Sequence, residues 1–379
     1  MIYFVFAIVS CLALSIANNT TLVAGKRTVR FEIGYLITTV IFTLLTGARA
    51  FSIGTDTMNY VYSAKAIQNS YSSIREIFTG YYVEPGYGML EFLCMRIFGD
   101  VHALFAIEGL ILLSGLFSFI KSFEGKISKP FAFLVFFTFY YGTSLNISRQ
   151  YIAVGIGLFA AKYLLNNKPW KYFLCCVISM LFHATGILLF GSYLIWKFVG
   201  SVDDSKKVKR RIVLLAVIVI GLCLFIQPLS TVLVRFGLLS TKYSSMLITG
   251  KESAASVISI IPSLPLLVLI IFLFKDLIEY DERNRMAITM YIFGFFISLV
   301  NIVFGNIGRL SAYWTCWQII LYPECIKLLC RRQSSPESRI LIKTFFVIFF
   351  FSYWYYSIVY RGFGNVYPYI SDIYSWMNW

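Results

Sequence analysis

The sequence predicts an all-α integral membrane protein with about twelve transmembrane helices. Hydrophobic residues make up 59% of the 379 residues and charged residues only 13%, which is too apolar for an ordinary soluble protein. The apolar residues come in solid runs, such as 212–225, 257–274 and 340–360. These runs approach the roughly 20 residues that a helix needs to cross a bilayer. We therefore expect a single polytopic transmembrane domain over residues 1–379.

The lysines and arginines predict the topology, because in membrane proteins they gather in cytoplasmic loops. The chain has a net charge of +15 and six polar, basic connections between its apolar runs, at 26–30, 121–129, 168–171, 197–211, 275–285 and 327–343. Placing all six in the cytoplasm puts about two-thirds of the lysines and arginines inside and both termini outside. The positive charge then follows from membrane topology, and no nucleic-acid partner is expected.

This topology predicts helices at about 1–17, 31–48, 101–120, 130–145, 148–166, 171–183, 184–198, 212–228, 257–275, 287–304, 309–328 and 340–359. The first run lacks the basic start of a signal peptide and is counted as a span. Residues 85–98 carry Glu91 and Arg96, so this short segment is predicted as a re-entrant or interfacial helix at the outer face. Outer loops are expected at 49–98 and 229–256, and a cytoplasmic linker at 199–211.

Six polar or charged side chains, which are unfavourable in the hydrocarbon core of a membrane, lie in or beside apolar segments. The predicted topology places all of them at the outer face. They are Arg49, Asp56, Glu84, Arg149, His183 and Arg309. Ionisable groups in a membrane are costly and usually mark a working site. The outer face is therefore the predicted functional site.

The arginines indicate an anionic ligand. Arg149 lies in a turn between two apolar helices, and Arg309 repeats this pattern beside Gly305 and Gly308, where the backbone can approach a ligand closely. A guanidinium stays charged and offers five donors in a rigid fork, which suits phosphate and diphosphate. Two such cations at one depth repel each other unless an anion joins them. Arg235 is a candidate extension of this patch.

Two interpretations stay open for each of the other three side chains. Asp56, in a Gly-Thr-Asp turn, is either a helix N-cap or an acid that orients Arg49 or takes a proton. Glu84, just before a proline, either stabilises the start of a helix or acts as a general base. His183 is either a core histidine bonded to Thr185 or a carbonyl, or a group for proton transfer or phosphate binding.

No metal site, disulfide framework or cofactor is expected. The eight cysteines lie within or at the ends of apolar segments and show no CxxC spacing. The predicted outer face also lacks a carboxylate cluster of the kind that forms a metal cage.

Several short motifs between about residues 30 and 190 together resemble a known family. They are Arg49, Ile53-Gly54-Thr55-Asp56-Thr57, Asn59-Tyr60, Glu84-Pro85-Gly86-Tyr87, Asn146 with Arg149-Gln150 and Ala153, and Phe182-His183. No single motif is specific, but their order and spacing are similar to those of the EpsG branch of the Wzy-type bacterial polysaccharide polymerases.

The resemblance implies a multi-spanning, GT-C-like glycosyltransferase in the bacterial plasma membrane, with its site facing outside. Such enzymes join oligosaccharide repeat units carried on undecaprenyl diphosphate into O-antigen, capsule or exopolysaccharide, alongside a flippase and a chain-length regulator. For this chain it implies that the base is Glu84, Asp56 or His183. It further implies that diphosphate and sugar are bound by Arg49, Arg149, Arg309, Gln150 and Tyr60, with Arg235 as a possible addition.

Two other functions share these features. A transporter or flippase of lipid-linked oligosaccharides should show internal repeats and ionisable groups spread through the membrane depth. This chain shows no repeat and gathers its ionisable groups at one face. A glycan ligase would differ from a polymerase in its acceptor rather than in its machinery. Polymerisation is the predicted function.

Overall fold

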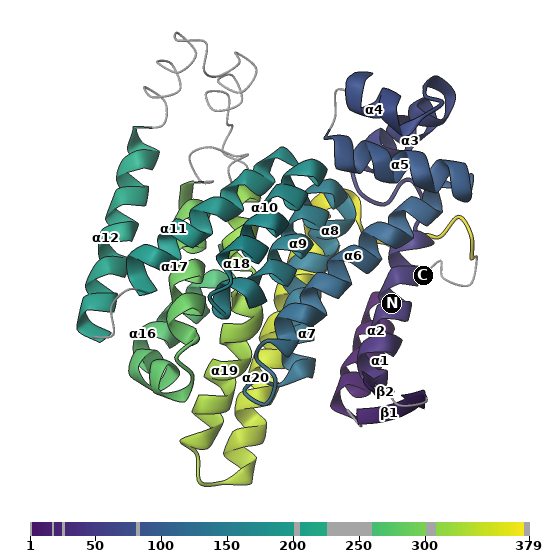
Figure 1. Cartoon of the computed structure of the whole chain (residues 1–379). Helices are drawn as coiled ribbons and strands as arrows, with labels where there is room; N and C mark the ends of the chain where they lie inside the picture. The colour runs from purple at the N-terminus through teal and green to yellow at the C-terminus, as the bar shows by residue number, and fades with distance from the viewer. Residues whose placement is uncertain are drawn as a thin grey trace. The chain divides into compact units, whose positions relative to one another are not determined.

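The computed structural model describes residues 2–16, 19–24, 27–80, 84–200, 205–225, 260–300 and 308–374, and these are mostly helical (Figure 1). They divide into two compact units. The first comprises Met1–Ile187 and Phe346–Trp379, and the second comprises Leu188–Phe345. The predicted outer loop at 229–256 lies outside the described residues.

The first unit contains most of the candidate site residues. Its elements are α1 (Ile2–Ser15), β1 (Asn19–Ala24), β2 (Arg27–Glu32), α2 (Ile33–Gly47), α3 (Thr57–Ser70), α4 (Ile74–Gly80), α5 (Pro85–Ile97), α6 (Val101–Lys121), α7 (Lys129–Phe136), the π-helix η1 (Phe137–Tyr141), α8 (Gly142–Asn146), α9 (Ser148–Leu165), α10 (Pro169–Phe182) and the 3₁₀ helix η2 (Ala184–Ile187). The chain returns to this unit through the second half of α20 (Pro336–Trp354), the π-helix η3 (Tyr355–Tyr360) and the 3₁₀ helix η4 (Phe363–Asn365).

The second unit consists of helices throughout its described part. They are α11 (Leu188–Gly200), α12 (Ser205–Leu224), α16 (Ser263–Tyr280), α17 (Asn284–Val300), α18 (Gly308–Thr315), α19 (Gln318–Arg331) and the first half of α20.

The predicted helices coincide with observed ones wherever their residues are described, with ends displaced by a few residues. The predicted span at 130–145 is interrupted by η1, and the one at 309–328 is broken between α18 and α19. Two described helices, Val101–Lys121 and Pro336–Tyr360, are by themselves long and apolar enough to cross a membrane. Shorter apolar helices are Ile2–Ser15, Ile33–Gly47, Pro169–Phe182, Ala184–Val199 and Asn284–Leu299. These apolar helices indicate a membrane protein.

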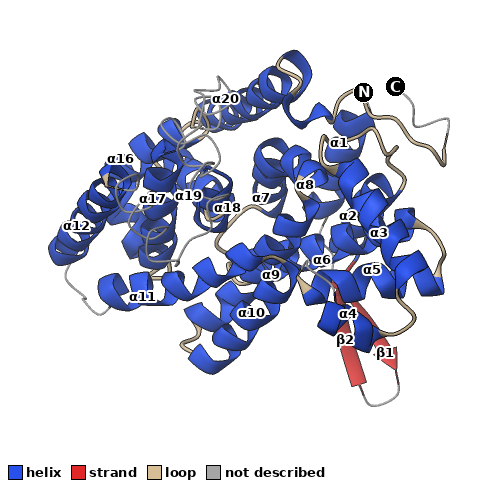
Figure 2. Ribbon diagram, turned by 90° about the horizontal axis from the view of Figure 1, so that it is seen from above, coloured by secondary structure: helices blue, strands red, loops and turns tan. Residues whose placement is uncertain are grey.

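One end of the first unit carries a short β-hairpin that was not predicted from the sequence. Strands β1 and β2 pair antiparallel (red in Figure 2). The base of the hairpin is held to the α6–α7 turn by Lys129, whose Nζ lies 2.6 Å from a carboxylate oxygen of Glu32 and 2.8 Å from one of Glu124. Two of the predicted basic connections, 26–30 and 121–129, therefore meet at this end, which we call the hairpin end.

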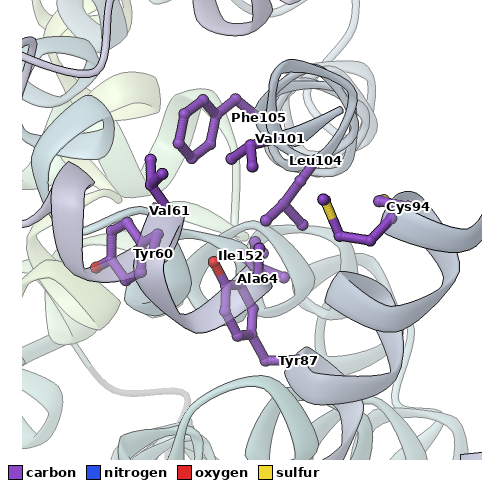
Figure 3. Close-up of a cluster of buried hydrophobic side chains, with 10 residues drawn as sticks. Tyr60, Val61, Ala64, Tyr87, Cys94, Val101, Leu104, Phe105 and Ile152 are labelled. Atoms are coloured by element: carbon purple, nitrogen blue, oxygen red, sulfur yellow. The ribbon is translucent and has the colours of Figure 1, made fainter. Parts of the chain in front are cut away.

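At the opposite end, which we call the capped end, α3, α4 and α5 lie across the ends of the longer helices (Figure 1). The α3 and α5 helices pack on α6 and α9 through a buried cluster of apolar side chains (Figure 3). Its members are Tyr60, Val61, Ala64, Tyr87, Cys94, Met95, Val101, Leu104, Phe105 and Ile152. Burying the larger members, such as Leu104 and Phe105, contributes roughly 1.5–3 kcal/mol each, so α3 and α5 of the predicted outer loop 49–98 are firmly packed helices.

The C-terminal segment also packs against the capped end. The Tyr3 hydroxyl donates to the Val366 carbonyl at 2.8 Å, and the Tyr369 hydroxyl donates to the Leu45 carbonyl at 2.9 Å. The described N- and C-terminal segments therefore meet at this end, on the same side as the predicted outer loop 49–98.

Helices α6 and α9 pack closely because glycines face each other. A Cβ added to Gly115 would lie 2.0 Å from the carbonyl oxygen of Gly155, a backbone atom rather than the end of a flexible side chain. Small residues at such crossings let two membrane helices approach closely.

We predict that Gly115→Ala separates these helices and lowers the free energy of unfolding by about 1–3 kcal/mol, the usual cost of overpacking. Thermal unfolding of the purified protein in detergent measures this. Gly191→Ala on α11 is the matched control, because no described atom outside the local helix backbone lies within 4 Å of the added Cβ. Equal melting temperatures for the two variants would contradict the close α6–α9 contact.

Candidate functional site

A carboxylate, a guanidinium and a histidine-bearing turn meet at the capped end. One oxygen of Glu84 lies 3.3 Å from a terminal nitrogen of Arg149, and its other oxygen accepts a hydrogen bond from the Ala184 amide at 3.0 Å. The side chains of Arg149 and Glu84 are 29% and 19% exposed. Glu84 therefore joins the starts of α5 and α9 to the turn after α10, and the pair remains accessible to a ligand.

Local sequence explains this meeting. Pro85 occupies the first turn of α5, where its missing N–H is not needed. Gly86 follows, and a Cβ there would lie 2.8 Å from the Leu181 carbonyl oxygen near the end of α10. Glycine thus lets α5 begin against α10. Glu84 occupies the N-cap position of α5 but forms no capping hydrogen bond, so simple capping does not explain it.

Asp56 also lies at an N-cap position, of α3, and its side chain likewise makes no capping bond. The turn before it is instead held by Asn146, whose Oδ1 accepts from the Thr55 hydroxyl and from the Asp56 amide, both at 2.9 Å. Gly54 permits the turn, since its φ of +95° is in the region that favours glycine. Asp56 is thereby tied to Asn146, three residues before Arg149.

We predict that Asn146→Ala loosens this turn, because two donors lose their acceptor at a side chain that is only 6% exposed. The expected loss is about 1–3 kcal/mol of unfolding free energy. Asn146→Asp keeps an accepting oxygen and should retain most of the stability. Thermal unfolding of both variants tests this, and equal losses would show that the two hydrogen bonds are not what Asn146 contributes.

His183 ends α10 and is half-buried. Its Nδ1 accepts from the Thr185 amide at 3.3 Å and lies 2.6 Å from the Thr185 hydroxyl. An acceptor at Nδ1 places the proton of the neutral ring on Nε2. The bond to Thr185 that the sequence suggested is therefore present, and it uses the lone pair that a base would need. This geometry favours His183 as a hydrogen-bond donor.

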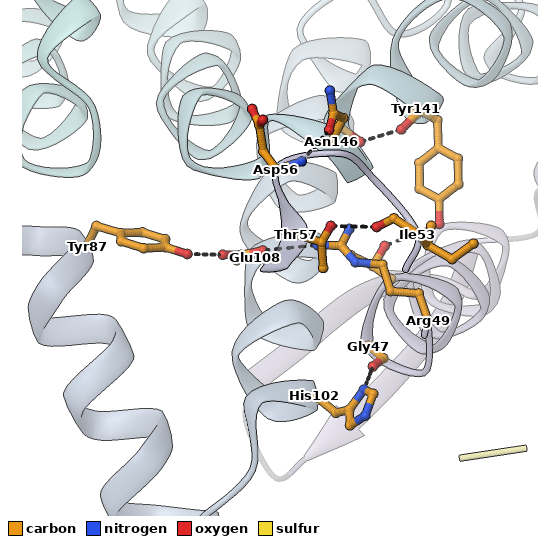
Figure 4. A network of polar contacts seen from close by, with 12 residues as sticks. Gly47, Arg49, Ile53, Asp56, Thr57, Tyr87, His102, Glu108, Tyr141 and Asn146 are labelled. Carbon is orange, nitrogen blue, oxygen red and sulfur yellow. Dashed lines mark hydrogen bonds and ion pairs between the residues drawn. The ribbon is translucent and has the colours of Figure 1, made fainter. Parts of the chain in front are cut away.

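Arg49 differs sharply from Arg149, because it is completely buried. Its guanidinium lies 4.2 Å from the centre of the Phe105 ring. It also lies 3.9 Å from a carboxylate oxygen of Glu108 (Figure 4). Among the described residues, none of its three side-chain nitrogens has a hydrogen-bond partner. Arg49 is enclosed by protein in this structure, so its geometry suits a supporting role better than direct contact with a ligand.

Glu108 was not among the residues predicted from the sequence. This carboxylate is 3% exposed on α6, where it accepts a hydrogen bond from the Tyr87 hydroxyl at 2.8 Å (Figure 4). Burial raises the pKa of the Tyr87 phenol, so the hydroxyl keeps its proton and remains a donor. The sequence does contain a signal for Glu108, because it is an acid within a long apolar run. Ionisable residues in such runs usually mark a functional site, and this holds for Glu108 as it does for the arginines.

The remaining candidates are placed as follows. Tyr60 is buried with its ring 6.0 Å from the Arg149 guanidinium, and Gln150 is also buried, so both lie behind Arg149 rather than on an open surface. Arg309 is exposed in the first turn of α18 and belongs to the second unit. Arg235 lies outside the described residues. No group of three or more metal-ligating side chains gathers among the residues that the structure describes.

Comparison with known proteins identifies the family. The EpsG family model matches residues 32–371, which include all the candidate residues and most of each unit. No curated protein and no solved structure matches the chain. The match spans most of the sequence and includes the Glu84–Arg149 pair and the C-terminal segment that packs on the capped end. The chain therefore belongs to the EpsG family, a membrane family linked to exopolysaccharide biosynthesis.

Proposed function

We propose that this protein is a membrane glycosyltransferase that polymerises oligosaccharide repeat units carried on undecaprenyl diphosphate into a surface polysaccharide. The observation that carries the proposal is the partly exposed Arg149, paired with Glu84 beside the His183 turn at the capped end. Membership of a family linked to exopolysaccharide biosynthesis supports it.

In the proposed reaction, the growing chain on undecaprenyl diphosphate is the donor. A hydroxyl of a second lipid-linked repeat unit attacks the anomeric carbon, the bond from that carbon to the phosphate oxygen breaks, and undecaprenyl diphosphate leaves. Arg149 binds the diphosphate, and Arg309 is a second candidate ligand. Negative charge grows on the leaving group during this step, so a fixed guanidinium stabilises the transition state more than the ground state.

We assign the base to Glu84 on the strength of its contact with Arg149. Without substrate, the carboxylate of Glu84 forms an ion pair with the same guanidinium that a diphosphate would bind. A bound diphosphate competes for Arg149 and releases Glu84, which can then accept the proton of the attacking hydroxyl. The Asp56 amide donates to Asn146, and Nδ1 of His183 accepts from the Thr185 amide.

For the topology, we propose about twelve crossings of the bacterial plasma membrane, with the capped end outside and the hairpin end in the cytoplasm. The basic connections at the hairpin end agree with the positive-inside rule. With the site at the membrane boundary, the lipid tails can remain between helices while the sugars stay in water. A flippase and a chain-length regulator are the expected partners.

The deciding experiment gives the purified protein, in nanodiscs, authentic lipid-linked repeat units and examines the products by gel electrophoresis. Polymerisation predicts a ladder of lengthened, lipid-linked chains. A folded protein that gives no ladder refutes the proposal. Transfer of the glycan to another acceptor, without lengthening, would instead identify a ligase, and movement of the substrate across a liposome membrane would identify a flippase.

A further inference from the structure

Glu108 is a buried acid whose presence in α6 needs a reason. It forms an ion pair at 3.9 Å with Arg49, and the two side chains are 2% and 0% exposed. Removing two such charges from water costs several kcal/mol for each ion, so an ion pair of this kind is weak support for stability by itself. A role in holding functional groups would explain why α6 carries it.

Glu108 is connected to the three segments that carry the candidate site. Tyr87, its hydrogen-bond donor, follows Glu84 by one turn of α5. Arg49, its ionic partner, begins the turn that leads to Asp56. Glu108 also lines a cavity of about 10 Å³ together with Ser148, the residue before Arg149. That volume leaves room for about one water molecule at most.

The contact with Tyr87 reaches Arg149 directly. The Arg149 guanidinium lies 5.5 Å from the centre of the Tyr87 ring, within the range of a cation–π interaction. The ring is 1% exposed, and its hydroxyl at the far end is bonded to Glu108. The Glu108 carboxylate therefore fixes the ring on which the guanidinium rests.

We propose that Glu108 is a positioning residue, which acts through Tyr87 to set the direction of the Arg149 guanidinium toward the diphosphate. This inference rests on the proposed function, because it assigns the diphosphate to Arg149. Glu108 touches no substrate, since it is enclosed by protein. Groups that orient metal ligands typically change affinity or activity by about 10–100-fold when they are removed, and we expect a loss of similar size here.

A double-mutant cycle tests the proposal, with undecaprenyl diphosphate as the binding probe and the full-length protein in nanodiscs. Glu108→Gln should weaken binding by about 10-fold or more. Arg149→Lys keeps the charge but loses the directional fork. In the Arg149→Lys background, Glu108→Gln should therefore cause little further loss, and the two effects should not add.

Tyr87→Phe provides an independent test if Glu108→Gln folds poorly. It keeps the ring and removes only the hydroxyl that Glu108 holds, and it should reproduce the weakened binding. Glu324→Gln on α19 is the matched control, because Glu324 is a fully buried acid in the second unit. This control should leave the binding curve unchanged.

The outcomes separate the two proposals. If wild-type protein binds the probe and the losses from Glu108→Gln and Arg149→Lys multiply, Glu108 only supports the fold and the positioning role is refuted. Unchanged binding by Tyr87→Phe would refute it as well. If the wild-type protein neither binds undecaprenyl diphosphate nor lengthens chains, the proposed function itself fails.

Discussion

Replacing Arg149 with alanine should lower kcat/KM for chain elongation by at least about 100-fold, the loss seen when one fixed donor to a developing negative charge is removed. Arg149 is the partly exposed guanidinium of the Glu84 contact, so it can reach a bound diphosphate. Arg149→Lys should recover only part of the rate, because an ammonium is a point charge and cannot bind two oxygens in a planar fork. Gel analysis of initial elongation rates measures both effects.

Protein yield and melting temperature distinguish this loss from misfolding. A folded variant that has lost elongation identifies a functional role for Arg149, whereas a lost fold identifies a structural role for its contact with Glu84. Lys162→Ala is the matched control, since it removes a cation from the same helix about 20 Å away along the axis. A folded Arg149→Ala variant with normal elongation would eliminate Arg149 as the diphosphate ligand.

Much of the fold could be predicted because the signals are local. The apolar runs and basic connections predicted the approximate bounds of the described helices in both units. The basic segments 26–30 and 121–129 were predicted on one side, and they meet at one end of the first unit. The β-hairpin at 19–32 had no such signal, because its pairing is set by contacts that hydropathy does not record. The docking of residues 361–374 on the capped end also depends on tertiary packing far along the chain.

The site was only partly predictable for the same reason. The turns that bear Glu84, Arg149 and His183 were expected at one face, and the structure brings them into contact. The sequence could not distinguish Arg49 from Arg149, because the difference comes from Glu108 and Phe105 on α6. The sequence predicts the depth of each charged residue in the membrane. It does not predict which side chains surround that residue, because these come from distant parts of the chain.

Glu84→Gln should cause the largest loss among the three candidate bases, about 10²–10⁴-fold in kcat. The substitution keeps the size of the side chain and an oxygen that can accept from the Ala184 amide, but it removes the charge and the ability to take a proton. Asp56→Asn and His183→Gln should each reduce kcat much less. Elongation rates at saturating lipid-linked substrate compare the three variants.

Chemical rescue separates a base from a group that only holds Arg149. Added formate should partly restore elongation by Glu84→Ala, because a small carboxylate can occupy the vacated space and accept the proton. Glu76→Gln on α4, an exposed acid in the segment between α3 and α5, should not change the elongation rate. If formate restores no activity to a folded Glu84→Ala variant, the proton goes to another group and Glu84 is only the partner of Arg149.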